Sequence, residues 1–237
     1  MLAKWAMAWL GAGSVIMDDP EPLPPEAELA LAWSGPNLRG PLTIALQLDR
    51  RLARIVMRTS EPMLGQMRLA WWRDVLGKPA AERPGGDVVL DAIDVHWAGR
   101  EAALVQMVDG WEVLVTAERI GPDEAAGFGT GRGAFFVALA ANASPAIKQS
   151  AASAGFRWAL ADAVTGVSDE TERAALITAG LTRWAEDGAG GGRLSAELRP
   201  LAVLDALALR ALRRGGRPLM EGRGASLAAF RAAIFRK

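Results

Sequence analysis

Apolar residues recur with helical spacing along most of the chain, and no alternating strand pattern persists. The clearest case is 42–58, where an apolar stripe that includes Leu48 lies beside a row of arginines, Arg50, Arg54 and Arg58. Similar spacing predicts helices from about residue 25 and over 42–58, 61–76, 88–95, 100–115, 135–141, 150–167, 171–186 and 195–214, with a short last helix near Lys237. The sequence therefore predicts an all-α domain of about eight helices without an internal repeat.

Stretches rich in proline and glycine are expected to separate these helices. They are SGPNLRGP (34–41), GKPAAERPGGD (77–87), IGPDEAAG (120–127) and EDGAGGGR (186–193). Thr59 or Ser60 is expected to cap the helix that begins near Pro62. GTGRG at 129–133 is expected to be a helix-breaking turn, because it lacks the lysine and the strand–turn–helix setting of a nucleotide-binding loop. Residues 150–167 are rich in Ala and Gly, which should allow neighbouring helix backbones to approach closely.

Composition and charge exclude several classes of function. The 27 basic and 27 acidic residues cancel, so no overall basic field favours binding to nucleic acid. The chain contains no cysteine, which excludes disulfides, thiol nucleophiles and Cys-based metal sites. Its one histidine, His96, has no His or Cys companion and is expected at the surface or in a loop. Asp109 and Glu112, three residues apart on one helix, are expected to be exposed rather than to bind a metal.

The chain ends differ in character from the middle. Residues 1–25 are predicted to be an irregular segment and 26–237 one helical domain. The first residues have the outline of a weak secretory signal but lack a clean cleavage site, and no stretch reaches transmembrane length without a charge. The prediction is a soluble, cytoplasmic protein. The arginines near the end of the helix at 195–214 suit its dipole, and the alternative is peripheral membrane contact through Arg210, Arg213, Arg214 and Arg217.

The stretch EPMLGQMRLAWWRDVL, residues 61–76, is apolar almost all round the predicted helix. Helices of this kind are normally surrounded by other helices. Arg68 and Asp74 fall at or inside the apolar arcs, and a buried charge requires a partner. One interpretation is a central core helix with a structural Arg–Asp pair. The other is that its arginines line a cavity that binds anions.

The same stretch resembles the segment by which the squalene/phytoene synthase family is often identified, with a Glu-Pro pair before an Arg and a Trp-Trp-Arg-Asp run. Its neighbours follow the family order: LTIALQLDRRLARIV, GRGAFFVALAANA, AGFRWALADAVTGVSDE and LRPLAVLDALALRALRRGG. The resemblance covers roughly residues 26–237. It implies an all-α isoprenoid-synthase-like helical bundle around a central cavity.

The resemblance also implies a chemistry, the head-to-head joining of two prenyl diphosphates. Two Asp-rich helices would face each other and hold Mg²⁺ against the diphosphate, and arginines would bind its phosphates. The corresponding metal ligands are Asp49, Asp162, Asp169 and Glu170. The corresponding substrate-binding residues are Arg50, Arg54, Arg68, Trp72 and Arg73. Yet Arg50, Arg51 and Ala53 stand where further carboxylates are expected, as does Gly166 in the second motif.

This loss of acidic residues leads to two hypotheses. The first is a non-catalytic or repurposed family member, similar to the branch that resembles complex I assembly factors. Such a protein would bind a prenyl lipid, an anionic headgroup or a protein partner, and would need no cofactor. The alternative is an active prenyltransferase that uses Mg²⁺ with fewer carboxylates.

Overall fold

The computed structural model describes residues 22–59, 61–187 and 193–235, and every regular element in these ranges is a helix. The α-helices are α1 (Pro25–Ala32), α2 (Pro36–Arg58), α3 (Pro62–Gly77), α4 (Val88–His96), α5 (Glu101–Thr116), α6 (Pro122–Gly133), α7 (Phe135–Leu139), α8 (Pro145–Ala163), α9 (Glu170–Asp187), α10 (Arg199–Arg213) and α11 (Gly224–Phe235). Single 3₁₀ turns are η2 (Ala80–Glu82), η3 (Val164–Gly166) and η4 (Ala196–Leu198). The all-α prediction is confirmed.

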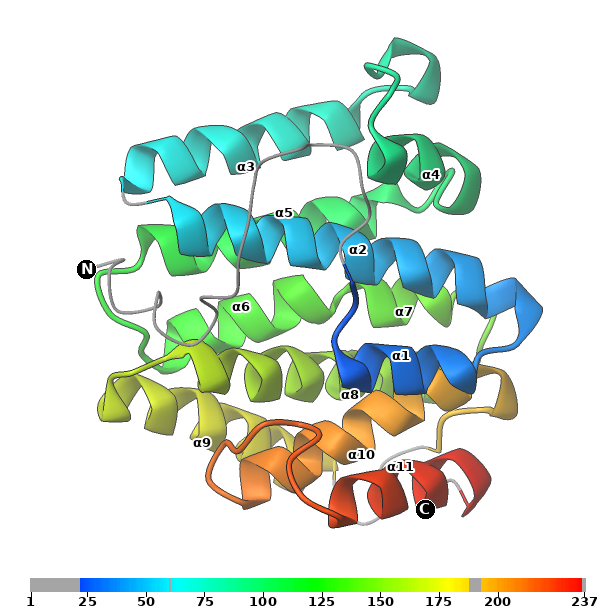
Figure 1. The fold of residues 1–237 in the computed structure, drawn as a ribbon, viewed down its shortest axis with the longest axis vertical. Coiled ribbons are helices and arrows are strands. Elements are labelled where there is room, and N and C mark those ends of the chain that lie inside the picture. Colours follow the sequence, from blue (N-terminus) through cyan, green and yellow to red (C-terminus); the bar gives the residue numbers. More distant parts are fainter. Residues whose placement is uncertain (1–21, 60, 188–192, 236–237) are drawn as a thin grey trace.

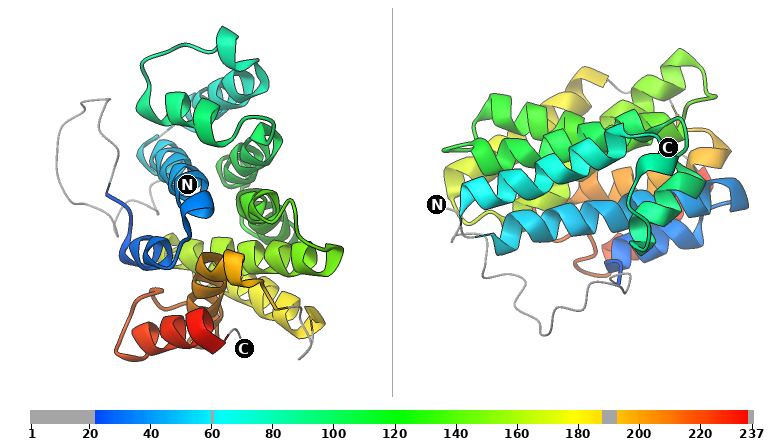
Figure 2. Two further views of the ribbon diagram at one scale, coloured as in Figure 1. Left: turned by 90° about the vertical axis from the view of Figure 1, so that its right-hand side faces the viewer. Right: turned by 90° about the horizontal axis from the view of Figure 1, so that it is seen from above.

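The helices form a stack along the long axis of the molecule (Figures 1 and 2). α3 packs on α5, α5 on α6, α6 on α8, α8 on α10 and α10 on α11. α2 lies against α4, α5 and α7, while α1 packs on α10. α3 and α11 therefore lie towards opposite ends of the molecule, and α6 lies in the middle.

Proline marks many of the helix starts. α1, α2, α3, α6 and α8 each begin at a proline, whose fixed φ suits the first helical position and whose missing N–H would have no partner there. Asp87 caps α4 by accepting hydrogen bonds from the backbone N–H groups of Val89 and Leu90, both at 2.9 Å. These local signals fix where the helices start along the stack.

Paired glycines bring α6 close to both of its neighbours. A Cβ added to Gly133 would lie 2.4 Å from the carbonyl carbon of Gly155 on α8. On the other side of α6, a Cβ on Gly110 of α5 would lie 2.5 Å from the backbone nitrogen of Arg132. The prediction that small residues in 150–167 allow close helix packing is confirmed. Side chains on the last turn of α6 are consequently held deep between α5 and α8.

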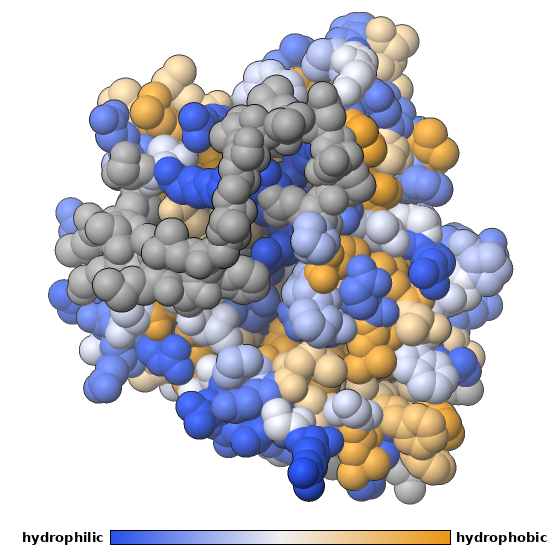
Figure 3. All heavy atoms as spheres, viewed as in Figure 1, coloured by the Kyte–Doolittle hydropathy of each residue, from blue (hydrophilic) through white to orange (hydrophobic). Residues whose placement is uncertain are grey.

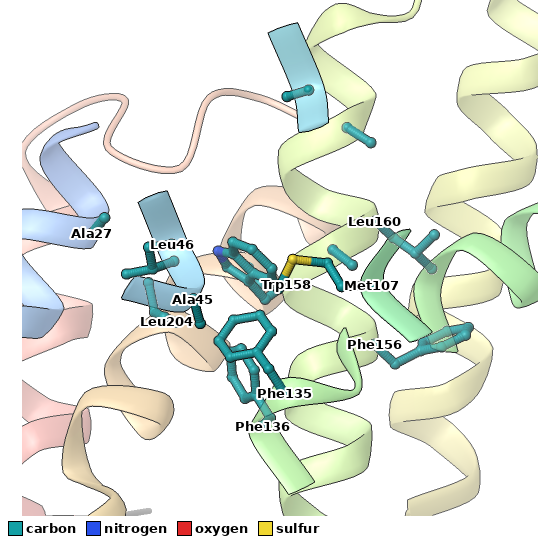
Figure 4. Packing of buried hydrophobic residues seen from close by; sticks show 14 of the residues in the cluster. Ala27, Ala45, Leu46, Met107, Phe135, Phe136, Phe156, Trp158, Leu160 and Leu204 are labelled. Atoms are coloured by element: carbon teal, nitrogen blue, oxygen red, sulfur yellow. The ribbon is translucent and has the colours of Figure 1, made fainter. Parts of the chain in front are cut away.

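Large aromatic side chains fill the interior beside this contact (Figure 4). The rings of Phe135 and Trp158 meet edge to face, with centroids 5.4 Å apart, and Phe136 packs against both. Met107 and Leu46 approach the same cluster from α5 and α2. The middle of the stack is therefore closely packed with apolar side chains.

Several local predictions are wrong. The break expected over 34–41 is shorter, because α2 already begins at Pro36. GTGRG is not a turn, and only Ile120 and Gly121 of IGPDEAAG lie in the break between helices, since residues 122–133 form the continuous helix α6. Four glycines in twelve residues give this segment a weak intrinsic helix preference, which its packing between α5 and α8 overrides.

The prediction of a central core helix at 61–76 is also wrong, because α3 lies at one end of the stack. Only one face is buried, and the opposite face leaves large apolar side chains in solvent, including Met63 (71% exposed) and Met67 (63% exposed). Arg68 and Asp74 are exposed, and Asp74 forms an ion pair with Lys78 at 2.7 Å rather than with an arginine. The all-round apolar pattern thus does not indicate all-round burial.

The start of α3 also differs from the predicted cap. Glu61 precedes the helix without a side-chain capping bond, while the hydroxyl of Thr59 donates to the Ile55 carbonyl at 2.6 Å. Ser60, most of the segment 1–25 and most of the break at 186–193 lie outside the described residues.

Candidate functional site

The two helices that the resemblance identifies as Asp-rich meet at a buried arginine. Asp49 lies on the buried face of α2, Asp162 lies in the last turn of α8, and Arg132 reaches both from the last turn of α6. Asp49 and Arg132 are each only 2% exposed. We call Asp49, Arg132 and Asp162 the central ion cluster.

The guanidinium of Arg132 makes four hydrogen bonds, three of them within the cluster. Its Nε and Nη2 donate to Oδ1 and Oδ2 of Asp49, both at 2.8 Å, which is the bidentate arrangement that suits a carboxylate. Nη2 also donates to Oδ2 of Asp162 at 2.6 Å, and Nη1 donates to the carbonyl oxygen of Ala159 at 3.0 Å. The cation therefore bridges α2 and α8.

Aromatic rings enclose this cation. The guanidinium carbon lies 4.7 Å from the ring centroid of Trp111 and 4.5 Å from that of Trp158, distances at which a cation interacts with the π face. The indole N–H of Trp111 donates to Oδ1 of Asp49 at 2.9 Å. Burial acts to lower the pKa of Arg132, but the attraction of Asp49 and Asp162 outweighs it and raises the pKa. The guanidinium is therefore charged at neutral pH.

Glu26 of α1 is a further carboxylate beside the cluster, and it is 9% exposed. Loss of hydration raises its pKa to about 7, with a smaller contribution from the negative charge of Asp162. The positive charges of Arg50 and Arg132 oppose this shift. Glu26 consequently titrates near neutral pH, unlike an ordinary glutamate.

The space between these helices is nearly filled. A cavity of about 10 Å³ remains, and its lining includes Glu26, Asp49, Arg50, Arg132 and Asp162. Such a volume holds about one water molecule. A prenyl chain has no room there.

The residues of the central ion cluster do not fit a magnesium site. Both oxygens of Asp49 already accept hydrogen bonds from Arg132, and the guanidinium lies where a cation between Asp49 and Asp162 would have to lie. Among the described residues, no group of three or more His, Asp or Glu side chains is placed to hold a metal ion. The arrangement is a structural ion cluster, with no open position for a ligand.

The remaining predicted metal ligands lie outside the cluster. Oδ1 of Asp169 accepts hydrogen bonds from the backbone N–H groups of Thr171 and Glu172 at 3.0 and 3.1 Å, an arrangement typical of a residue that caps a helix. Glu170 is exposed at the start of α9. Neither residue lines the cavity beside Asp49.

The predicted substrate-binding residues are also dispersed. Arg50 lines the small cavity, whereas Arg54, Arg68, Trp72 and Arg73 do not. Burial, and then the nearby charge of Arg58, lower the pKa of Arg54. Arg68 donates to the Thr59 hydroxyl at 3.3 Å, and Trp72 is buried. Of this set, therefore, only Arg50 lines the cavity beside Asp49 and Asp162.

Arg73 binds two carboxylates of the neighbouring helix α5. It donates to Asp109 at 2.7 Å and to Glu112, and these bonds to Glu112 and Asp109 raise the pKa of Arg73. The side chain of Asp109 is 50% exposed and that of Glu112 is 28% exposed. Within the Trp-Trp-Arg-Asp run, Arg73 thus joins α3 to α5.

Arg132 is the residue that sequence reasoning missed, because GTGRG was interpreted as a turn. A signal for it exists in the sequence. Gly129, Gly131 and Gly133 surround a single arginine, and two aspartates expected in the interior, Asp49 and Asp162, require a buried cation.

Fold and site together define an all-α protein whose two aspartate-bearing helices are joined by an internal guanidinium. No protein-family model matches the chain, and no curated protein or solved structure matches it. The resemblance to the squalene/phytoene synthases stays a prediction.

Proposed function

We propose that the protein is a non-catalytic relative of the squalene/phytoene synthases that acts by binding a partner. The observation that carries this proposal is Arg132 bridging Asp49 and Asp162. In an active enzyme of that kind, the corresponding carboxylates would bind magnesium, and magnesium would bind the diphosphate. Here a permanently charged side chain of the protein occupies the position between them.

Electrostatics supports the proposal. A diphosphate brought to Asp49 and Asp162 would meet two carboxylates, whose negative charges oppose binding unless cations lie between. Magnesium could enter only by displacing Arg132, which would leave a buried guanidinium without its carboxylates. Removing one partner from a buried ion pair costs about 3–5 kcal/mol.

Packing supports it as well. The cavity of about 10 Å³ at the cluster cannot accept a prenyl chain, so a prenyl lipid, an anionic headgroup or a protein partner would bind at the surface. None of the described helices is long and apolar enough to cross a membrane. We propose that the protein is cytoplasmic and that it contacts a membrane only peripherally.

The test is to incubate the purified protein with farnesyl or geranylgeranyl diphosphate and magnesium and to analyse the extracted products. We expect no hydrocarbon joined from two prenyl chains. Titration calorimetry with the same diphosphates should show no binding that depends on magnesium. Formation of the joined product would overturn the proposal.

The alternative, an active prenyltransferase with fewer carboxylates, makes the opposite predictions. Diphosphate binding would require magnesium and would be lost in Asp162→Ala, whereas Asp74→Ala, an exposed carboxylate on α3, would retain it. If Asp162→Ala leaves any diphosphate binding unchanged, that alternative fails.

A further inference from the structure

α11 has two apolar faces of very different kinds. At 100° per residue, its buried residues are all alanines on one side, Ala225, Ala229, Ala232 and Ala233. The large apolar residues occupy an arc of about 140° on the other side. They are Leu227 (59% exposed), Phe230 (48%), Ile234 (45%) and Phe235 (59%). A helix that only packs on a core would place its large side chains inward, so this outward face points to an apolar environment outside the molecule.

The position of α11 makes this face accessible. α11 packs on α10 at one end of the stack (Figures 1 and 2). In the space-filling view, hydrophobic residues gather over this end at the lower right, next to strongly hydrophilic ones (Figure 3). Arg231 lies in the middle of the outward arc and is exposed.

A groove of about 1300 Å³ borders the same helix and is lined from α8, α9, α10 and α11. Leu227 and Arg231 belong to its lining, so groove and apolar face are continuous. Arginines dominate the charged lining: Arg157, Arg183, Arg193, Arg210, Arg213, Arg214 and Arg231. Only three acidic residues accompany them, Glu186, Asp187 and Asp205.

Part of this positive charge is already neutralised inside the protein. Arg157 binds Asp187 and Asp205, and Arg213 lies over the ring of Trp184, 4.1 Å from its centroid. By contrast, Arg193, Arg210 and Arg231 form no ion pair with any carboxylate in the described ranges. Nη1 of Arg210 is buried without a hydrogen-bond partner. A buried donor without a partner gains a hydrogen bond if the partly exposed side chain turns outward to an anionic oxygen.

The sequence carries the same charge bias. Residues 193–235 contain eight arginines and three acidic residues, although the whole chain has 27 of each charge. This end of the molecule is therefore positive and the remainder negative. Such a separation orients the protein in the field of an anionic surface.

We propose that the outward face of α11 and the adjoining arginine groove bind the surface of an anionic phospholipid bilayer. Leu227, Phe230, Ile234 and Phe235 enter the boundary between headgroups and acyl chains, as the apolar face of an interfacial helix does. Arg210 and Arg231 bind lipid phosphates. A single outermost helix with projecting apolar side chains suits a bilayer better than an acidic partner protein, which would have to supply a matching apolar hollow.

This inference rests on the proposed function, because a protein that acts by binding rather than by catalysis needs a binding surface. The two have separate tests, because vesicle binding and product formation are independent measurements. Failure of either leaves the other measurement interpretable.

The experiment is co-sedimentation of the full chain with vesicles of phosphatidylcholine alone and with vesicles that also contain phosphatidylglycerol. We expect binding only to the anionic vesicles, and weaker binding as salt is raised. Each arginine near such a surface contributes about fivefold to binding, so Arg210→Gln/Arg231→Gln should bind about thirtyfold more weakly. Leu227→Ser/Phe235→Ser should lose at least about tenfold.

Matched controls come from other faces of the molecule. Arg119→Gln removes an exposed arginine between α5 and α6, and Met67→Ser removes an exposed apolar side chain of α3. Both should bind like the wild type. Circular dichroism and the melting temperature verify that each variant is folded. If Arg210→Gln lowers stability, Arg231→Gln alone provides a second test, because Arg231 is exposed.

The inference would be overturned by equal binding to neutral and anionic vesicles, by no vesicle binding at all, or by equal losses in the control and test variants. Soluble glycerol phosphate serves as a competitor. If it abolishes binding at the concentration of lipid phosphate present, the site recognises an isolated phosphate rather than a bilayer, and the inference is wrong.

Discussion

Replacement of Arg132 is the strongest test of the central ion cluster. Arg132→Gln removes the cation and leaves Asp49 buried at 2% exposure with one remaining side-chain donor among the described residues, the indole N–H of Trp111. Asp162 is 24% exposed and can turn to water. Most of the cost therefore comes from Asp49. We expect the free energy of unfolding to fall by about 3–5 kcal/mol, the usual cost of removing one partner from a buried ion pair.

This loss is a large part of the stability of a domain, which is typically about 5–15 kcal/mol. The four hydrogen bonds of the guanidinium cannot simply be added, because all share one cation and three of them share the same two carboxylates. Asp49→Asn should cost less than Arg132→Gln, since the arginine keeps Asp162 as its partner. The double variant Asp49→Asn/Arg132→Gln should be more stable than Arg132→Gln alone, because no charge remains buried without a counterion.

The assay is urea denaturation followed by tryptophan fluorescence, since Trp111 and Trp158 both contact the guanidinium. A loss below about 1 kcal/mol, as at an exposed ion pair, would refute the reasoning. So would a double variant that is no more stable than Arg132→Gln.

Three further predictions concern the pH dependence, the helix packing and the surface. Because the pKa of Glu26 is raised from 4.5 to about 7, its contribution favours folding most at acid pH and is lost as pH rises through this interval. Glu26→Gln should therefore be more stable than the wild type above pH 7, by up to about 3 kcal/mol. Urea denaturation at several pH values measures this, and a stability difference that does not change with pH would contradict it. Gly155→Ala should lower the unfolding free energy by about 2 kcal/mol because its Cβ would meet Gly133, while Gly77→Ala, with open space around it, should be neutral or stabilising. Thermal melts of the pair check this, and equal effects would contradict it. Arg73→Gln should lower the free energy of unfolding by less than about 1 kcal/mol, since the side chain of Arg73 is 35% exposed. A loss as large as that of Arg132→Gln in the same urea assay would show that exposure does not determine how much these ion pairs stabilise the protein.

The helix order could be predicted from the sequence because periodic apolar positions and Pro or Gly breaks are local signals. α5 and α9 begin and end within one residue of the predicted limits, whereas α8 begins and ends a few residues earlier than predicted. α6 could not be predicted in this way. Its glycines disfavour a helix in isolation, and the reason that they are present, contact with Gly110 and Gly155, depends on helices distant in the sequence.

The candidate site shows the same division between local and distant information. The resemblance predicts that Asp49 and Asp162 face each other, and both contact one side chain in the structure. That side chain belongs to the helix that local propensity failed to predict. The wrong prediction of a central core helix at α3 has a related cause: apolar residues all round a helix predict that other helices surround it. Which of these residues meet another helix depends on the position of α3 at the end of the stack.

Under the proposed relationship to the squalene/phytoene synthases, Arg132 provides a physical reason why acidic motifs could decay without loss of the fold. Two facing aspartates repel each other, and a protein that stops binding metal must remove them or supply another cation. A guanidinium supplies that charge and, through its planar set of donors, binds Asp49 in a bidentate manner while reaching Asp162 and the Ala159 carbonyl. It thereby joins α2, α6 and α8 as a bound metal would, but without exchange with solvent. Under the proposed function, the cluster contributes to stability, and binding takes place at a surface such as the proposed arginine groove beside α11.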